Sequence, residues 1–252
     1  MDDICNGNIS KSTLSRIEKY NQVPNFDTMQ YLLQQIDISF DEFDYLCHDY
    51  STTERQEIID EFYGLVSNSN LALIEKLIQR CEDYLKKDEN LKIQEILLIL
   101  NGRQSFFHDK LGVISDYTKE LVSPLWKRLE NASSWSYEDV RLMNCILYHL
   151  PIEVVEKNIP KIQATLRKYE GFKNMSTLNI SLLLNLSTLF LYNSKINKCQ
   201  EILDEAFYLN IKLKRYDFLG VILVRKGICA KNIDEINNGL KLLELVGELS
   251  RV

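Results

Sequence analysis

The sequence predicts an all-α protein with a small N-terminal head and a long body of helical repeats. Apolar residues recur every three or four positions in nearly every long segment, as in Ile74, Leu77, Ile78 and Cys81, which is the spacing of one helix face. The 252 residues contain nine glycines and four prolines, and the breaker clusters fall between the apolar runs. We therefore expect about thirteen to fifteen helices and no convincing strand.

Charge is distributed unevenly along the chain. The formal net charge is −6, and residues 1–50, with three basic and nine acidic side chains, account for all of it. The remaining residues carry equal numbers of basic and acidic side chains. We therefore expect two domains, residues 1–50 and 51–252, with the boundary near Asp49 to Thr53.

The first clear helix lies within residues 9–20, ISKSTLSRIEKY. Ser10 is a suitable N-cap, and Leu14 and Ile17 would face a core. An amphipathic helix that shows small polar and basic side chains fits a DNA major groove, where lysine or arginine binds guanine acceptors. A solvated surface helix is the alternative. The outward positions are Lys11, Ser12, Ser15, Arg16 and Lys19.

Two further short helices complete the head. Asn21 ends the first helix, and Pro24 stiffens the turn that follows. A second helix runs from Phe26 to Ile36, and a third begins at Phe40 after Ser39.

The body reads as helices of about 12 to 20 residues joined by short polar turns, so sequence neighbours must pack antiparallel. Leu147, Tyr148, Ile152 and Val155 recur 44 residues later as Leu191, Tyr192, Ile196 and Cys199. A looser third copy runs through residues 227–243. Periods near 40 indicate stacked helix pairs, in which each pair covers the apolar face of the next.

The head resembles the latter part of an XRE-type helix-turn-helix domain. The resemblance rests on S-x-S-T-L-S-R-I-E-K-x-x-x-x-P at 10–24 and D-I-S-F-D-E-F at 37–43. It implies that residues 9–20 form the recognition helix, with Lys11, Ser12 and Arg16 facing bases and Ser15 and Lys19 facing phosphates. Such a domain has a first helix and most of a second before this point, where this chain has eight residues. We therefore expect an N-terminally truncated head.

In a truncated head the apolar side chains that the first helix normally covers would be exposed. These are Leu14, Ile17, Leu32 and Leu33.

With this head, a helical-repeat body and WSYEDVRLMN at 135–144, the whole chain resembles the Rgg/MutR type of transcriptional regulators. The resemblance implies a partial DNA-binding head followed by a right-handed tetratricopeptide-like solenoid. It further implies a homodimer that binds double-stranded operator DNA and responds to a short hydrophobic signalling peptide, as in quorum sensing by a peptide pheromone.

Two polar stripes could receive such a peptide on the concave face of the repeats. In TLNISLLLNLSTLFLYN, steps of four, three and four place Ser181, Asn185, Thr188 and Tyr192 on one face of an apolar helix. Buried in a core, such groups would cost about 1 to 3 kcal/mol each if unpaired, and a groove removes that cost. Interhelix hydrogen bonds are the alternative.

The preceding repeat carries the second stripe, Arg141, Asn144 and Tyr148. Arg141 is expected to bind a peptide carboxylate, and Asn144 to hold the peptide backbone together with Asn185. Arg225 and Lys226 are weaker candidates, because charged pairs near helix ends are usually solvated.

No catalytic signature is present: the sequence lacks a phosphate-binding glycine loop, HExxH and GxSxG. The six cysteines stand far apart, without metal-ligand spacing. We expect no enzyme activity, no cofactor and no metal. We find no segment of eighteen uncharged apolar residues and no signal peptide, so we expect a cytoplasmic protein without a membrane span.

The competing interpretation is a helical-repeat scaffold that binds a protein partner and has a non-functional DNA-binding head. The acidic balance of residues 1–50 favours it, because attraction to phosphate grows with the number of basic residues. DNA readout by one small helix requires two half-sites and therefore a two-fold dimer. The terminal segment LKLLELVGELSRV shows an apolar stripe of Leu240, Leu243, Val246 and Leu249 or their neighbours. This stripe either contacts the dimer partner or packs back on its own repeat.

Overall fold

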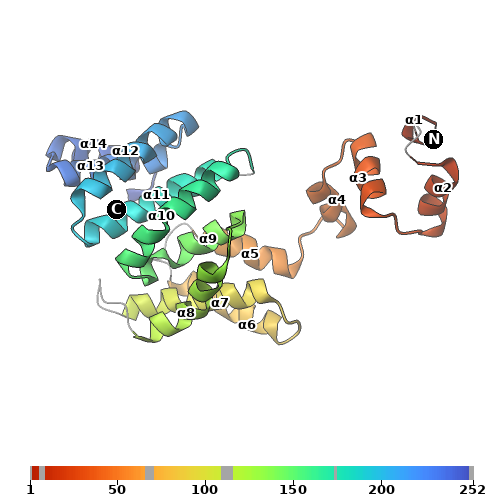
Figure 1. Ribbon diagram of the computed structural model, residues 1–252, viewed down its shortest axis with the longest axis horizontal. Helices are drawn as coiled ribbons and strands as arrows, with labels where there is room; N and C mark the ends of the chain where they lie inside the picture. Colours follow the sequence, from red (N-terminus) through yellow and green to blue (C-terminus); the bar gives the residue numbers. More distant parts are fainter. Residues whose placement is uncertain (1, 6–8, 66–70, 109–115, 173–174, 250–252) are drawn as a thin grey trace. The chain divides into compact units, whose positions relative to one another are not determined.

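The computed structural model describes residues 2–5, 9–65, 71–108, 116–172 and 175–249 (Figure 1). Within these ranges it has fourteen α-helices, one 3-10 helix and no strand, which confirms the all-α prediction. The chain divides into two compact units, Met1–Asp60 and Glu61–Val252. The division falls inside a helix, Glu54–Gly64, rather than in the segment 49–53 that precedes it.

The first unit consists of short helices with side-chain caps at the expected places. Ser10 accepts a hydrogen bond from the backbone of Thr13 at 3.0 Å, and Asn25 and Ser39 cap the next two helices in the same way. The helices of this unit are α1 (Asp2–Cys5), α2 (Lys11–Tyr20), α3 (Phe26–Gln35), α4 (Phe40–Cys47) and the beginning of α5 (Glu54–Gly64).

The head has its own small core, so the expectation of four exposed apolar side chains is wrong. Leu14 is 4% exposed and Leu33 is 3% exposed. Leu14 is buried because Cys5 and Ile9 lie in the same cluster, against which Ile4, Ile17, Tyr31 and Leu32 also pack. The Tyr31 hydroxyl donates to the carbonyl of Ile4 at 2.7 Å and ties α3 to the N-terminal residues.

The second unit contains the remaining helices, in which neighbours along the chain pack against each other as Figure 1 shows. Their bounds are α6 (Leu71–Leu85), α7 (Leu91–His108), α8 (Asp116–Asn131), α9 (Tyr137–Ile146), the 3-10 helix η1 (Leu147–His149), α10 (Ile152–Lys168), α11 (Met175–Tyr192), α12 (Ile196–Leu213), α13 (Tyr216–Ala230) and α14 (Ile233–Leu245).

The sequence repeat corresponds to a structural repeat. Ile152, Ile196 and Ile233, which are equivalent in the three copies, are the first residues of α10, α12 and α14. The second copy is the pair α11 and α12, and the third is the pair α13 and α14. The third pair is packed most closely: a Cβ on Gly239 would lie 2.7 Å from the backbone oxygen of Gly220.

Helix α11 is the most apolar helix of the unit that the structure describes. Met175–Tyr192 has no charged residue and is, by length and composition alone, apolar enough to cross a membrane, although seven of its eighteen residues are Ser, Thr or Asn. Half of the helix is buried inside the unit, where it contacts α9, α10, α12 and α13. Its apolar composition is therefore that of a core helix.

Candidate functional site

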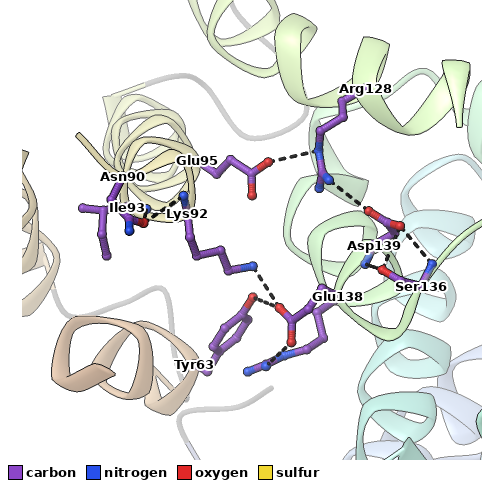
Figure 2. Close-up of polar contacts among 10 residues, drawn as sticks. Tyr63, Asn90, Lys92, Ile93, Glu95, Arg128, Ser136, Glu138 and Asp139 are labelled. Atoms are coloured by element: carbon purple, nitrogen blue, oxygen red, sulfur yellow. Dashed lines mark hydrogen bonds and ion pairs between the residues drawn. The ribbon is translucent and has the colours of Figure 1, made fainter. Parts of the chain in front are cut away.

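The position of α9 is set by its first turn. Ser136 and Asp139 form a capping box, in which each side chain accepts a hydrogen bond from the other residue's backbone nitrogen. The Trp135 indole nitrogen donates to the carbonyl of Leu129 at 2.8 Å. The Arg128 guanidinium on α8 bridges Asp139 and Glu95 of α7 at 3.1 and 3.0 Å, as Figure 2 shows. Two neighbouring helices, α7 and α8, thus hold the start of α9.

The two predicted polar stripes face each other and are joined by hydrogen bonds. The Tyr148 hydroxyl donates to Oδ1 of Asn185 at 3.0 Å, and Nδ2 of Asn185 donates to Oδ1 of Asn144 at 2.9 Å. Nδ2 of Asn144 donates in turn to Oγ of Ser181 at 3.2 Å. The four side chains form one continuous chain between α9, η1 and α11, which we call the amide network.

The amide network borders a cavity of about 370 Å³. Six of the seven residues predicted for peptide binding line it. Sequence reasoning did not single out the other lining residues for peptide binding, because most come from α5, α7 and the segment after α5 and share no helix with the two stripes. The lining residues are Phe62, Tyr63, Leu65, Arg103, Asn144, Cys145, Tyr148, His149, Ser181, Asn185, Thr188 and Tyr192.

Arg141 is the predicted residue that does not line the cavity. Its guanidinium donates to Glu138 at 2.8 Å and lies 3.2 Å from the centre of the Tyr63 ring, so it stands behind one lining residue. Glu138 also binds Lys92 of α7 at 2.9 Å, and Figure 2 shows the side chains of Lys92 and Tyr63 directed at its carboxylate. Arg141 supports the cavity wall in this arrangement.

The lining includes side chains whose protonation is altered by burial. Burial lowers the pKa of His149 to about 4, and Arg103 lowers it further, so this imidazole is neutral at physiological pH. Burial also raises the pKa of the Tyr148 hydroxyl and of the Cys145 thiol. All three therefore face the cavity as neutral groups.

Arg225, on α13, is not solvated as the sequence suggested. Its Nη1 donates to the carbonyl of Leu184 at 2.5 Å and to Oγ of Ser187 at 2.9 Å. Leu184 and Ser187 are buried on α11, next to the amide network. Lys226, the other weak candidate, binds Asp204 of α12.

In the head, α2 presents the predicted face. Lys11, Ser12, Arg16 and Lys19 are exposed, Ser15 is partly buried, and Leu14 is on the buried side. The helix ends where predicted, because Asn21 adopts a left-handed conformation (φ 52°) and its backbone N–H bonds the carbonyl of Arg16. The geometry is that of a short amphipathic helix with a basic outer face.

All six cysteines are free thiols; Cys5, Cys81 and Cys199 are buried, whereas Cys47 is exposed. Over the described parts of the chain, no three His, Cys, Asp or Glu side chains group as metal ligands would.

These features define a class: a helical-repeat body with a polar cavity, joined to a small helical head. No known family model matches the sequence, and no curated protein matches it. Solved structures do match. A candidate transcriptional regulator from Listeria monocytogenes EGD-e has a TM-score of 0.74 and 18% identity, over 98% of this chain and 86% of that one.

Two further structures extend the match to peptide receptors. Bacillus thuringiensis PlcR, solved with the peptide PapR7 and DNA, has a TM-score of 0.67 and 17% identity, over 99% of this chain and 91% of that one. The SHP pheromone receptor Rgg2 of Streptococcus dysgalactiae has a TM-score of 0.64 and 18% identity, over 97% and 87%. The chain thus shares its fold with these solved structures, which include a pheromone receptor and a protein solved with a peptide and DNA.

Proposed function

We propose that this protein is a cytoplasmic transcriptional regulator that binds operator DNA as a homodimer and responds to a short hydrophobic peptide. The observation that carries the proposal is the amide network beside a cavity in the repeat unit. The shared fold supports it, because the PlcR structure holds both a peptide and DNA.

The network suits a peptide backbone. Each residue of an extended peptide presents one N–H donor and one C=O acceptor, and a side-chain amide can bond either. The amide nitrogens of Asn144 and Asn185 each carry two protons, and the network uses one from each. The second N–H of each amide is available to a peptide carbonyl without breaking the network. Peptide side chains would occupy the aromatic part of the cavity near Phe62.

The basic face of α2 suits duplex DNA. A single helix of this size contacts a few base pairs, so useful affinity requires a second copy of the head on an adjacent half-site. At the other end of the chain Leu245 is 84% exposed, and Val246 and Leu249 are 40% and 49% exposed. This apolar surface supports the proposed homodimer.

Two measurements test the proposal. Native mass spectrometry of the protein purified from its own host is expected to show a bound peptide, and Asn185→Leu is expected to lose it. A complex with no peptide mass would contradict the sensor role. Selection from random duplexes is expected to give an operator that Arg16→Ala no longer binds, while Arg167→Ala, at an exposed site on α10, still binds it.

A protein-interaction scaffold is the second candidate function, and one observation favours it. Phe26 and Phe40 stack with ring centres 5.5 Å apart, although they are 67% and 43% exposed. Exposed aromatic pairs are typical of protein-binding surfaces. Under this alternative the random-duplex selection would recover no preferred sequence, and Arg16→Ala would change nothing.

A further inference from the structure

The lining of the cavity carries one positive charge and no negative charge. It includes one residue that is ionised at neutral pH, Arg103, and neither an aspartate nor a glutamate. His149 is the other basic group, and its burial keeps it neutral. The cavity therefore presents a single positive charge surrounded by neutral donors and aromatic rings.

Among the residues that the structure describes, Arg103 has no acidic partner. The guanidinium lies 5.1 Å from the centre of the Phe62 ring, and its charge acts on the buried Cys145 thiol; both partners are neutral groups. Among the described residues, no carboxylate pairs with it, in contrast to Arg80, Arg128, Arg141 and Arg215, which all bind acids. A partly buried cation without a counter-ion attracts an anion strongly, because the surroundings screen its field poorly.

The charges behind the lining add to this field. Lys92 and Arg141 share one carboxylate, that of Glu138, so this cluster carries a net positive charge. Arg225 interacts with a backbone carbonyl and a hydroxyl, which are neutral. The surroundings of the cavity are thus positive on more than one side.

We infer that the cavity selects peptides that carry a carboxylate, and that Arg103 is the specificity-determining residue that binds it. A guanidinium presents parallel N–H donors that match the two oxygens of a carboxylate. The inference rests on the proposed function and assigns to Arg103 the role that the sequence suggested for Arg141. The carboxylate belongs either to the C-terminus of the peptide or to an Asp or Glu side chain.

Affinity-selection mass spectrometry with three synthetic pools tests this. All pools are acetylated hexapeptides randomised over Ile, Leu, Val, Phe and Gly; the first ends in a free acid and the second in an amide. The third ends in an amide and contains one Asp at a random position. The full-length protein is expected to retain acid peptides at least about tenfold better than plain amides, the factor that charge-assisted hydrogen bonds provide.

Variants assign the preference to Arg103. Arg103→Gln is expected to retain acid peptides and plain amides equally. Arg103→Lys should keep part of the preference for acids, because lysine keeps the charge without the paired donors. Arg167→Gln, an exposed arginine on α10, is the matched control and should behave as the wild type. Circular dichroism confirms that each variant is folded.

The outcomes distinguish a failure of the role of Arg103 from a failure of the proposed peptide binding. Retention of the Asp-containing amides would place the carboxylate on a side chain, and their loss would place it at the C-terminus. Equal retention of acids and amides by the wild type, or an unchanged preference in Arg103→Gln, would overturn the inference and leave the peptide cavity intact. Retention of no pool would contradict the proposed function itself, and the inference with it.

Discussion

The amide network predicts a measurable coupling between Tyr148 and Asn185. Asn185→Leu removes two hydrogen bonds, to Tyr148 and to Asn144, and Tyr148→Phe removes one of the same two. At about 1 kcal/mol per net hydrogen bond, the expected losses of unfolding free energy are about 2 and about 1 kcal/mol. Because the double variant loses the shared bond once, its loss should be smaller than the sum by about 1 kcal/mol.

Urea denaturation of the full chain, followed by far-ultraviolet circular dichroism, measures these differences. For a unit of this size, about 2 kcal/mol also corresponds to a fall in Tm of about 4 to 8 °C. Tyr192→Phe is the control, because Tyr192 lines the same cavity but is 66% exposed. Losses that add to within about 0.3 kcal/mol would show that the two residues are uncoupled and would refute the network.

Three further predictions concern other parts of the chain. The lowered pKa of His149, about 4, means that the unfolded chain takes up the proton first. The free energy of unfolding should therefore fall as the pH drops from about 6.5 to 4, by about 2 kcal/mol at pH 5. In urea titrations, His149→Gln should make the free energy of unfolding depend less on pH. An unchanged pH dependence would contradict the burial of a neutral His149. Gly239→Ala should destabilise the protein by about 1 to 3 kcal/mol in the same titration, because its Cβ would meet the Gly220 backbone oxygen; a gain would mean that helix propensity outweighs the clash. Leu14→Ala should lower the stability of the head by about 2 to 5 kcal/mol, because it removes a buried side chain, and should thereby lower the amide-exchange protection of residues 11–20. Unchanged protection would contradict the assignment of Leu14 to the core of the head.

The parts of the site that lie on one helix could be predicted from sequence. Ser181, Asn185, Thr188 and Tyr192 follow the period of a helix, so their common face is a consequence of backbone geometry alone. Asn144 and Tyr148 share a face by the same spacing in the preceding repeat, whereas the hydrogen bonds that join the two faces were not predicted. Both predictions depend on spacing, and the structure places these residues as spacing requires.

The lining residues outside the two stripes could not be predicted in this way. Their position depends on which helices surround the cavity, and the spacing of residues within one segment does not show which helices pack together. Phe62 and Tyr63 come from α5, and Arg103 comes from α7. The one available signal was the arginine itself, a cation in the largely apolar segment 91–108. Arg141 does not line the cavity for a related reason: its guanidinium packs on Tyr63, which lies on α5, where spacing within α9 could not place it.

The prediction that the apolar side chains of the head are exposed was wrong for a different reason. It assumed that only a full first helix could cover Leu14, yet Cys5 and Ile9 bury it. A small core needs apolar atoms in the right place and not a particular helix, since the hydrophobic effect is not directional.

The hydrogen bonds within the amide network affect how tightly the cavity could bind a peptide. A polar stripe on an apolar helix is costly when its groups are unpaired, but here Asn185 and Asn144 satisfy each other, with Tyr148 and Ser181 at the ends. The side chains are therefore held in place before a ligand arrives, which reduces the entropy lost on binding. The network uses one N–H of each amide, so in the proposed complex a peptide carbonyl would bind the other without disrupting the bonds that order the site. If the hydrogen bonds of the network had to break before binding, the free energy of breaking them would reduce the affinity for the peptide.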